Sequence, residues 1–214
     1  MHLTIILLVL LHSGLSSAAP QILPRLPARD PFTLPSVVST SFSGSGCPQG
    51  TTDASADLWE NFSFTLPSFK AKTGPSSAVA ERSVNCQGHV NFGGSTTGWQ
   101  FALKEHWSKG YLELDGAGVT LTQYLTVYFS QDAANTATTV QSIPSKDNST
   151  VSDLSLHTTI PEAALVWSPC NSGGILNVNF RMAFTGATRN VTAYYGAGKN
   201  ISVSEQWEWT WRQC

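Results

Sequence analysis

Three pairs of ionisable residues are the places where this sequence could support acid–base catalysis. Glycoside hydrolysis uses two carboxyl groups that flank the bond to be cut, one as proton donor and the other as base or nucleophile. The candidate pairs are Glu105 beside His106, Glu113 with Asp115, and Glu205 with Glu208. In an extended strand Glu113 and Asp115 would share a face, about 7 Å apart, whereas Glu205 and Glu208 would point to opposite faces. Surface solvation or turn formation explains each pair more simply, so we expect no catalytic residue.

The histidines and serines offer no better catalytic or metal-binding pattern. After the N-terminal segment the histidines are His89, His106 and His157, with no His-x-His or His-x-x-x-His pair among them, so the spacing typical of metal ligands is absent. The segment 43–46 (SGSG) comes near the Gly-x-Ser-x-Gly pattern of serine hydrolases, but it lies in a glycine-serine approach to Cys47 and not after a strand. We therefore expect no metal and no cofactor.

Alternation of apolar and polar residues predicts one strand after another. The clearest segments are 62–66, 99–104, 119–130 and 176–184. Period two with threonine, valine and aromatic residues is typical of antiparallel strands with one buried face. Glycine-containing turns punctuate the chain at 93–94, 116–118, 172–174 and 196–198. The sequence predicts an all-β fold, either an antiparallel two-sheet sandwich or a jelly roll.

A further strand is predicted at the C-terminal end of the sequence, and it carries Trp207, Trp209 and Trp211 on one face. Such a face can stack on sugar rings, enter a membrane interface or fill a core. The opposite face begins with Asn200, which lies in an N-glycosylation sequon, and a glycan there would require that face to be in water. We therefore expect the tryptophans in the core, with Glu205 as the residue on their face that needs a partner.

The N-terminal residues follow the pattern of a secretory signal peptide. An apolar run over 3–11 precedes small residues at 16–19, and it is too short to span a bilayer. We expect a signal peptide over 1–18, a proline-rich linker or pro-segment over 19–40, and a secreted domain over 41–214. No later stretch reaches the roughly 18 to 20 apolar residues that a membrane helix needs, so no transmembrane segment is expected.

Charge and modification motifs agree with an extracellular location. Four sequons are candidate glycosylation sites: Asn61, Asn148, Asn190 and Asn200. Only 12% of residues are charged and the net charge is −2. No basic cluster is present that could neutralise phosphates, which excludes nucleic acid as a partner.

Four cysteines in a secreted chain predict two disulfides. Sequential pairing joins Cys47 to Cys86 and Cys170 to Cys214, and closes two loops of similar length. Nested pairing, Cys47 with Cys214 and Cys86 with Cys170, is also physically reasonable. The sequence alone does not choose between them, and we expect the sequential pattern.

Several motifs together resemble one protein family. They are 47–51 (CPQGT), 62–64 (FSF), 83–87 (SVNCQ), 165–170 (LVWSPC), 176–179 (LNVN) and 207–214 (WEWTWRQC). Over residues 45–214 the chain resembles the domain-of-unknown-function 4360 family of small secreted proteins, found largely in fungi. The resemblance implies secretion, an all-β domain and the four cysteines. It transfers no catalytic residue, because none is firmly assigned in the family.

Three functions are compatible with these observations. The first is a secreted, disulfide-stabilised glycoprotein that binds polysaccharide or an extracellular protein at the cell wall, host surface or extracellular matrix, without catalysis. Its candidate ligand platform is Trp99, Trp107 and Trp167. The second is an extracellular carbohydrate-active hydrolase that uses loop carboxylates. The third, suggested by the seven tryptophans, is a membrane-active or toxin-like β-protein.

Overall fold

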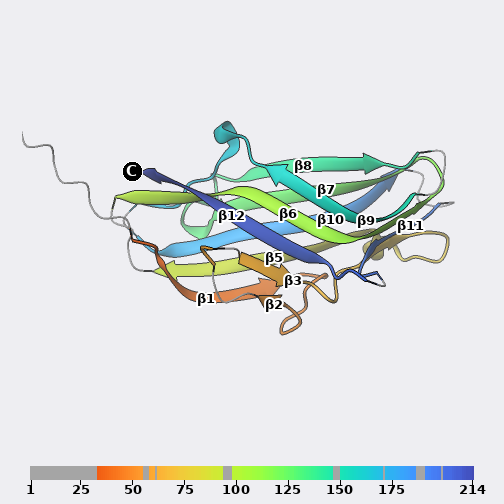
Figure 1. Ribbon diagram of the computed structural model, residues 1–214, viewed down its shortest axis with the longest axis horizontal. Helices are drawn as coiled ribbons and strands as arrows, with labels where there is room; N and C mark the ends of the chain where they lie inside the picture. Colours follow the sequence, from red (N-terminus) through yellow and green to blue (C-terminus); the bar gives the residue numbers. More distant parts are fainter. Residues whose placement is uncertain are drawn as a thin grey trace, which may run out of the picture.

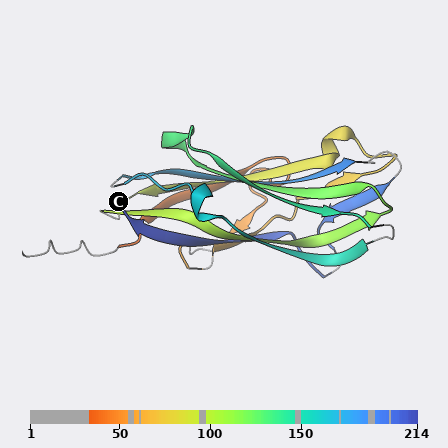
Figure 2. The same cartoon turned by 90° about the horizontal axis from the view of Figure 1, so that it is seen from above.

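The computed structural model describes residues 33–54, 58–60, 62–93, 98–146, 150–170, 172–186, 191–198 and 200–214. Within these ranges two antiparallel β-sheets pack face to face, and their strands run along the long axis of the molecule (Figures 1 and 2). The predicted all-β, two-sheet architecture is confirmed. In the part of the chain that the structure describes, three short 3₁₀ helices connect strands, at Val79–Arg82, Ser130–Asp132 and Glu162–Ala164. In the described part of the chain, no helix has the length and apolar character needed to cross a membrane.

One sheet has five strands. In spatial order they are β1 (Ser36–Ser43), β5 (Ser83–Gly93), β10 (Gly174–Gly186), β7 (Val119–Phe129) and β8 (Ala137–Pro144). Strand β10 is central, and its Asn179 lies opposite Gln87 of β5 on one side and Thr126 of β7 on the other. On β5 the even-numbered residues from 84 to 92 are buried and the odd-numbered ones are not. The five-stranded sheet therefore has one apolar inner face and one polar outer face.

The second sheet is built around β6 (Trp99–Asp115). Its other strands are β2 (Asp53–Ala54), β3 (Phe62–Thr65), β4 (Ala71–Thr73), β9 (Thr150–Thr159), β11 (Thr192–Gly196) and β12 (Ser204–Gln213). β12 pairs with β6 over residues 99–109 and β11 pairs with it over 111–115, while β9 pairs with it over 105–114. Strands β12 and β11 thus follow each other along one edge of β6, and β9 occupies the opposite edge.

A β-bulge reverses the inward face of β6 partway along the strand. Glu208 and Trp209 are neighbours on β12, but they lie opposite Glu105 and Leu103, so Lys104 is the extra residue. Upstream of the bulge, 101 and 103 are buried; downstream, the even-numbered residues from 106 to 114 are buried. An inserted residue shifts the two-residue period by one.

The C-terminal strand β12 places its aromatic face in the core. Trp207 is 2% exposed and Trp209 is 9% exposed, which confirms the prediction for both, while Trp211 is partly buried against the core. The Trp209 indole donates to the Leu58 carbonyl over 2.7 Å. A β-carbon added at Gly88 on the opposite sheet would lie 2.8 Å from the Trp207 ring, so glycine is what allows the two sheets to approach here.

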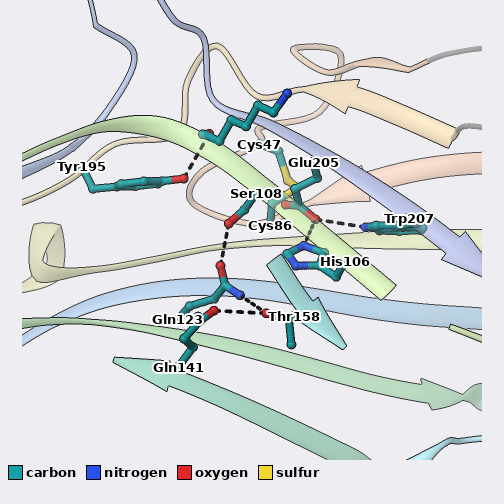
Figure 3. A network of polar contacts seen from close by, with 11 residues as sticks. Cys47, Cys86, His106, Ser108, Gln123, Gln141, Thr158, Tyr195, Glu205 and Trp207 are labelled. Atoms are coloured by element: carbon teal, nitrogen blue, oxygen red, sulfur yellow. Dashed lines mark hydrogen bonds and ion pairs between the residues drawn. A yellow bond between two sulfur atoms is a disulfide. The ribbon is translucent and has the colours of Figure 1, made fainter. Parts of the chain in front are cut away.

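Glu205 has its partner inside the core (Figure 3). Its Oε2 lies 3.1 Å from His106 Nε2, and the two side chains are 1% and 0% exposed. The same oxygen accepts a hydrogen bond from the Trp207 indole over 3.2 Å. Among the described residues, His106 Nδ1 and Glu205 Oε1 have no hydrogen-bond partner. Burial of this pair depends on both partners being present.

A chain of polar side chains links the two sheets beside this pair (Figure 3). Ser108 of β6 donates to Gln123 of β7 over 2.6 Å, and Gln123 donates to Thr158 of β9 over 3.1 Å. Thr158 donates in turn to Gln141 of β8 over 3.3 Å. Because the partners alternate between sheets, these bonds fix how the sheets are placed relative to one another.

Two disulfides join Cys47 to Cys86 and Cys170 to Cys214. This is the sequential one of the three pairings. The first bond ties the loop before β2 to β5 in the core, and the second ties the loop before β10 to the last residue of the chain.

Strand β1 begins at Ser36, so residues 36–40 belong to the sheet although the sequence analysis placed them in the linker. Pro35 is the last proline of the segment, and after it nothing prevents backbone pairing. The pairing with β5 runs from Ser36 opposite Gly93 to Ser43 opposite Gln87, and the Ser36 hydroxyl donates to the Gly93 carbonyl over 2.6 Å.

The predicted signal peptide, 1–18, lies outside the described residues.

Replacing Glu205 by alanine should destabilise the fold strongly, because His106 would stay buried without its partner. Loss of one member of a buried pair costs about 3–5 kcal/mol, so the free energy of unfolding measured in urea should fall by that amount. Glu208→Ala is the matched control: it lies on the same strand with an exposed side chain and should change stability by less than about 1 kcal/mol. Equal losses for both variants would contradict a structural role for the pair.

Tyr195 should make the fold sensitive to alkali. Burial, and next the nearby Glu205 carboxylate, raise the pKa of Tyr195 far above its usual value. Below about pH 10, the usual pKa of tyrosine, Tyr195 is neutral in both the folded and the unfolded state, and the folded protein keeps its full stability. Above that pH the tyrosine ionises first in the unfolded state, so stability is lost as pH rises.

The free energy of unfolding should therefore fall above pH 10 by up to about 1.4 kcal/mol per pH unit from this group. Tyr195→Phe should remove that part of the slope, whereas Tyr111→Phe, on the outer face of β6, should retain it. Urea unfolding at a series of pH values measures the slopes, and identical slopes for the two variants would refute the assignment.

Candidate functional site

The three tryptophans of the predicted ligand platform do not lie together. Trp99 and Trp107 are both on β6, but they are separated by roughly 25 Å along the strand and by the bulge. Trp167 lies in the loop before β10, where the Arg212 guanidinium sits 4.1 Å above its ring. Arg212 pairs with Gln100, and Gln100 donates to the Ser168 carbonyl, so Trp167 and Trp99 lie at the same end of β6 and Trp107 lies apart from both.

The candidate carboxylates are also dispersed. Glu105 and Glu113 both face outward from β6, with about half of the strand's length between them, and Asp115 is exposed at its end. Glu205 is buried and Glu208 is exposed, which confirms that these two point to opposite faces. The His106–Glu205 pair is closed off from solvent, so a substrate has no access to it.

One pair of carboxylates does come together, and it was not among the predicted pairs. Glu113 and Asp153 line a hollow of about 740 Å³ together with Tyr111, Tyr194 and Asn200. Tyr111 lies opposite Asp153 and Glu113 lies opposite Val151, so the two acids are diagonal neighbours with about 7–8 Å between their backbones.

Asn200, a predicted glycosylation site, is exposed at this hollow. The other three sequon asparagines, Asn61, Asn148 and Asn190, lie outside the described residues.

The most extensive candidate site is the outer surface of the five-stranded sheet, which we call the amide face. Its members are amide, hydroxyl, aromatic and basic side chains in register on neighbouring strands: Asn85, Gln87 and His89 on β5, Asn177, Asn179 and Arg181 on β10, Tyr124, Thr126 and Tyr128 on β7, and Thr138 on β8. Eight of these ten line one shallow hollow of about 450 Å³. His89 and Asn177 lie beside the hollow.

Hydrogen bonds hold the amides of this face in defined orientations. Gln87 donates to the Tyr128 hydroxyl over 2.9 Å and accepts from Asn179 over 3.2 Å. Asn177 is only 3% exposed; its oxygen lies 2.8 Å from His89 Nδ1, and its amide donates to Ser130 over 2.8 Å. Asn177 is therefore a positioning residue, and the more exposed amides remain able to make further bonds to a ligand.

An aromatic surface lies beside the amides. The Arg181 guanidinium sits 4.0 Å above the Tyr124 ring, which orders both groups. Arg181 lies opposite Asn85 on one side and Tyr124 on the other. The hollow thus combines ring surface with donors and acceptors, which is the combination found in sites for polar organic ligands.

Acidic residues are absent from this sheet. The five strands, all within the described ranges, contain no aspartate or glutamate, and the basic residues on their outer face are Arg181 and His89. The acidic residues among the strands, such as Glu105 and Glu113, lie on the other sheet. The amide face can therefore bind through hydrogen bonds and ring contacts, but it has no carboxyl pair for glycoside cleavage.

The amide face was not among the sites predicted from the sequence. The available signal was the nature of the outward residues: Asn85, Gln87 and Asn179 are amides where exposed strands more often carry charge. Nothing in the sequence shows that β5, β10 and β7 are neighbours, so these residues could not be grouped.

Comparison with known proteins gives a family but no activity. A family model described as a domain of unknown function, DUF4360, matches residues 34–214. An uncharacterized secreted protein of Arthroderma benhamiae is 30% identical over 183 residues, covering 83% of this chain and 71% of that protein.

Among solved structures, the enzymatically active domain of bacteriophage CBA120 tailspike protein 4 matches 82% of this chain with 10% identity and a TM-score of 0.23. The match covers 19% of the tailspike chain, and so low a TM-score supports no argument about fold or activity. The family model spans nearly all of the described residues and agrees with the motifs of the sequence. The chain belongs to the DUF4360 family of domains of unknown function.

Proposed function

We propose that this protein is a secreted, non-catalytic binding protein whose amide face takes a neutral polysaccharide. The observation that carries the proposal is an ordered, acid-free face of amides and tyrosines on one side of a rigid sandwich. The signal-like N-terminus and the similarity to a secreted protein support an extracellular location.

The chemistry of the face favours sugar hydroxyls as ligands. A hydroxyl both donates and accepts hydrogen bonds, and so does a carboxamide, which makes Asn85, Gln87 and Asn179 suitable partners. Tyrosine rings offer flat apolar surface to the C–H faces of a sugar, together with a polar hydroxyl. A neutral ligand also fits the low charge of the site, because Arg181 is the one charged side chain among the residues that line the hollow.

The arrangement of the face favours a chain over a small ligand. Successive cross-strand rows, His89–Asn177–Tyr128, Gln87–Asn179–Thr126 and Asn85–Arg181–Tyr124, repeat across the sheet. Neighbouring strands lie about 4.8 Å apart, so each row presents polar groups at regular intervals. The hollow is open and shallow, and an extended ligand could pass across it.

A hydrolase is the second candidate function, and Glu113 with Asp153 is the observation that favours it. These two acids share a hollow with Tyr111 and Tyr194, and glycoside cleavage uses two carboxyl groups that flank one bond. A glycan on Asn200 would stand at the same hollow. The membrane-active alternative has less support, because Trp207 and Trp209 are buried.

Binding should depend on Tyr124. We expect the protein to be retarded in native gels that contain a soluble β-glucan, a mannan or a chitin oligosaccharide, and not in gels that contain polygalacturonate. Tyr124→Ala should weaken binding about tenfold, since truncation of a central aromatic contact costs more than about 1 kcal/mol. Asn179→Ala should weaken it by a smaller factor.

Tyr111→Ala is the matched control, because it removes a tyrosine from the outer face of the other sheet. It should bind the polysaccharide as the wild type does. Retardation that is equal for all three variants, or absent for every neutral polysaccharide, would contradict the proposal.

No turnover should accompany binding, because the amide face has no carboxylate. Incubation with the bound polysaccharide should release no reducing ends above the level of a blank. Release by the wild type that is lost in Glu113→Gln and Asp153→Asn would instead establish the hydrolase.

A further inference from the structure

A separate hollow lies on the outer surface of the seven-stranded sheet, beside Trp107. Its volume is about 450 Å³, and it extends over β6, β12, β3 and β2. Its polar lining offers both hydrogen-bond donors and acceptors, from Asp53, Ser63, Thr65, Lys109, Ser204 and Gln206. Of its charged residues, Asp53 and Lys109 are exposed and opposite in sign, while Glu205 is buried against His106, so the exposed lining suits a neutral ligand.

The Trp107 ring is held in place from one side. The rings of Trp107 and His157 are parallel to within 2°, with centroids 4.6 Å apart. His157 Nε2 in turn lies 2.5 Å from Glu105 Oε2. These contacts reduce the rotamer freedom of the indole before any ligand arrives.

The register shows which side of Trp107 is left for a ligand. His157 lies opposite Trp107 on β9, and Gln206 lies opposite Trp107 on β12, at the other edge of β6. Ser63 of β3 lies opposite Gln206. The row therefore runs His157, Trp107, Gln206, Ser63, and the hollow begins on the side of Trp107 that His157 does not cover.

We propose that this hollow is a second carbohydrate site, which binds one neutral pyranose ring stacked on Trp107. Sugar C–H groups pack against the indole, while hydroxyls donate to Asp53, accept from Lys109 and exchange hydrogen bonds with Ser63 and Gln206. An ordered aromatic wall with a few polar groups around it is typical of small-ligand sites.

The second site would make the domain bivalent. The two sheets form separate layers (Figure 2). The amide face belongs to one sheet and the Trp107 hollow to the other, so one molecule could hold two polysaccharide chains at once. Because the two sites face away from each other, they would join two separate chains and not hold one flat surface twice. Bivalency rests on the proposed function of the amide face, whereas the Trp107 site does not.

Calorimetric titration tests the site with short oligosaccharides of the β-glucan, mannan and chitin classes. Trp107→Ala should weaken binding of one class by tenfold or more, and a thermal melt should show that the variant is folded. His157→Ala should weaken binding about threefold through loss of the stacked neighbour, and His157→Phe, which keeps a ring there, should restore it. Repeating the titrations in a Tyr124→Ala background separates this binding from binding at the amide face, and the effects of Trp107→Ala and His157→Ala should persist there.

Cross-linking tests bivalency separately. The wild type should raise the turbidity of a soluble polysaccharide solution, and Trp107→Ala should still be retarded in the gel without raising turbidity. The Trp107 site is refuted if Trp107→Ala titrates as the wild type does, or if no oligosaccharide of the three classes binds. If instead Trp107→Ala weakens binding and Tyr124→Ala has no effect in the gel, the Trp107 site stands and the function proposed for the amide face fails.

Discussion

Burial of one face of each strand against the opposite sheet is the constraint on which the rest of this structure depends. On β5 it commits Val84, Cys86 and Val90 to the core, and by the same alternation it turns Asn85 and Gln87 outward. The core determines which residues remain for the outside. A binding surface on such a sandwich is therefore a consequence of core packing, held in place by strands that cannot rotate independently.

At the Lys104 bulge, the face of β6 that points into the core is reversed. Because the period shifts by one residue, His106 enters the core to meet Glu205, and Trp107 reaches the outer surface to stack on His157. Without the extra residue, the parity of Phe101 and Leu103 would place Trp107 inside and His106 outside. Bulges often re-aim side chains near functional sites, and here the same bulge brings His106 to Glu205 in the core and exposes the Trp107 ring.

Much of the architecture could be predicted from the sequence because it depends on patterns that lie within single segments of the chain. The alternation along 119–130 and 176–184, and the inward tryptophans of β12, follow from a two-residue period that each segment shows by itself. The need of Glu205 for a partner followed from the same parity. The identity of that partner did not, because the bulge that turns His106 inward depends on how β6 pairs with β12.

The candidate sites could be predicted less well because they are not local. Asn85, Tyr124 and Arg181 are far apart in the sequence, and only the order of the strands in the sheet makes them neighbours. Glu113 and Asp153 meet for the same reason, through pairing of β6 with β9. A search along the sequence favours residues that are close in number, such as Glu113 and Asp115.

Two outer faces with different chemistry emerge from this arrangement. One is wide, amide-rich and free of acids; the other carries the acidic strand residues and a single ordered tryptophan beside a compact hollow. The family has no assigned activity that would distinguish binding from catalysis. Binding by the amide face must therefore be tested directly. If the amide face is a binding surface, its side-chain amides must contact the ligand.

The side-chain amide signals in nitrogen–proton correlation spectra, followed as a soluble neutral polysaccharide is added, test that claim most directly. The account predicts that the side-chain signals of Asn85, Gln87 and Asn179 shift together with a single saturation curve. Binding that leaves these three signals unmoved would contradict it.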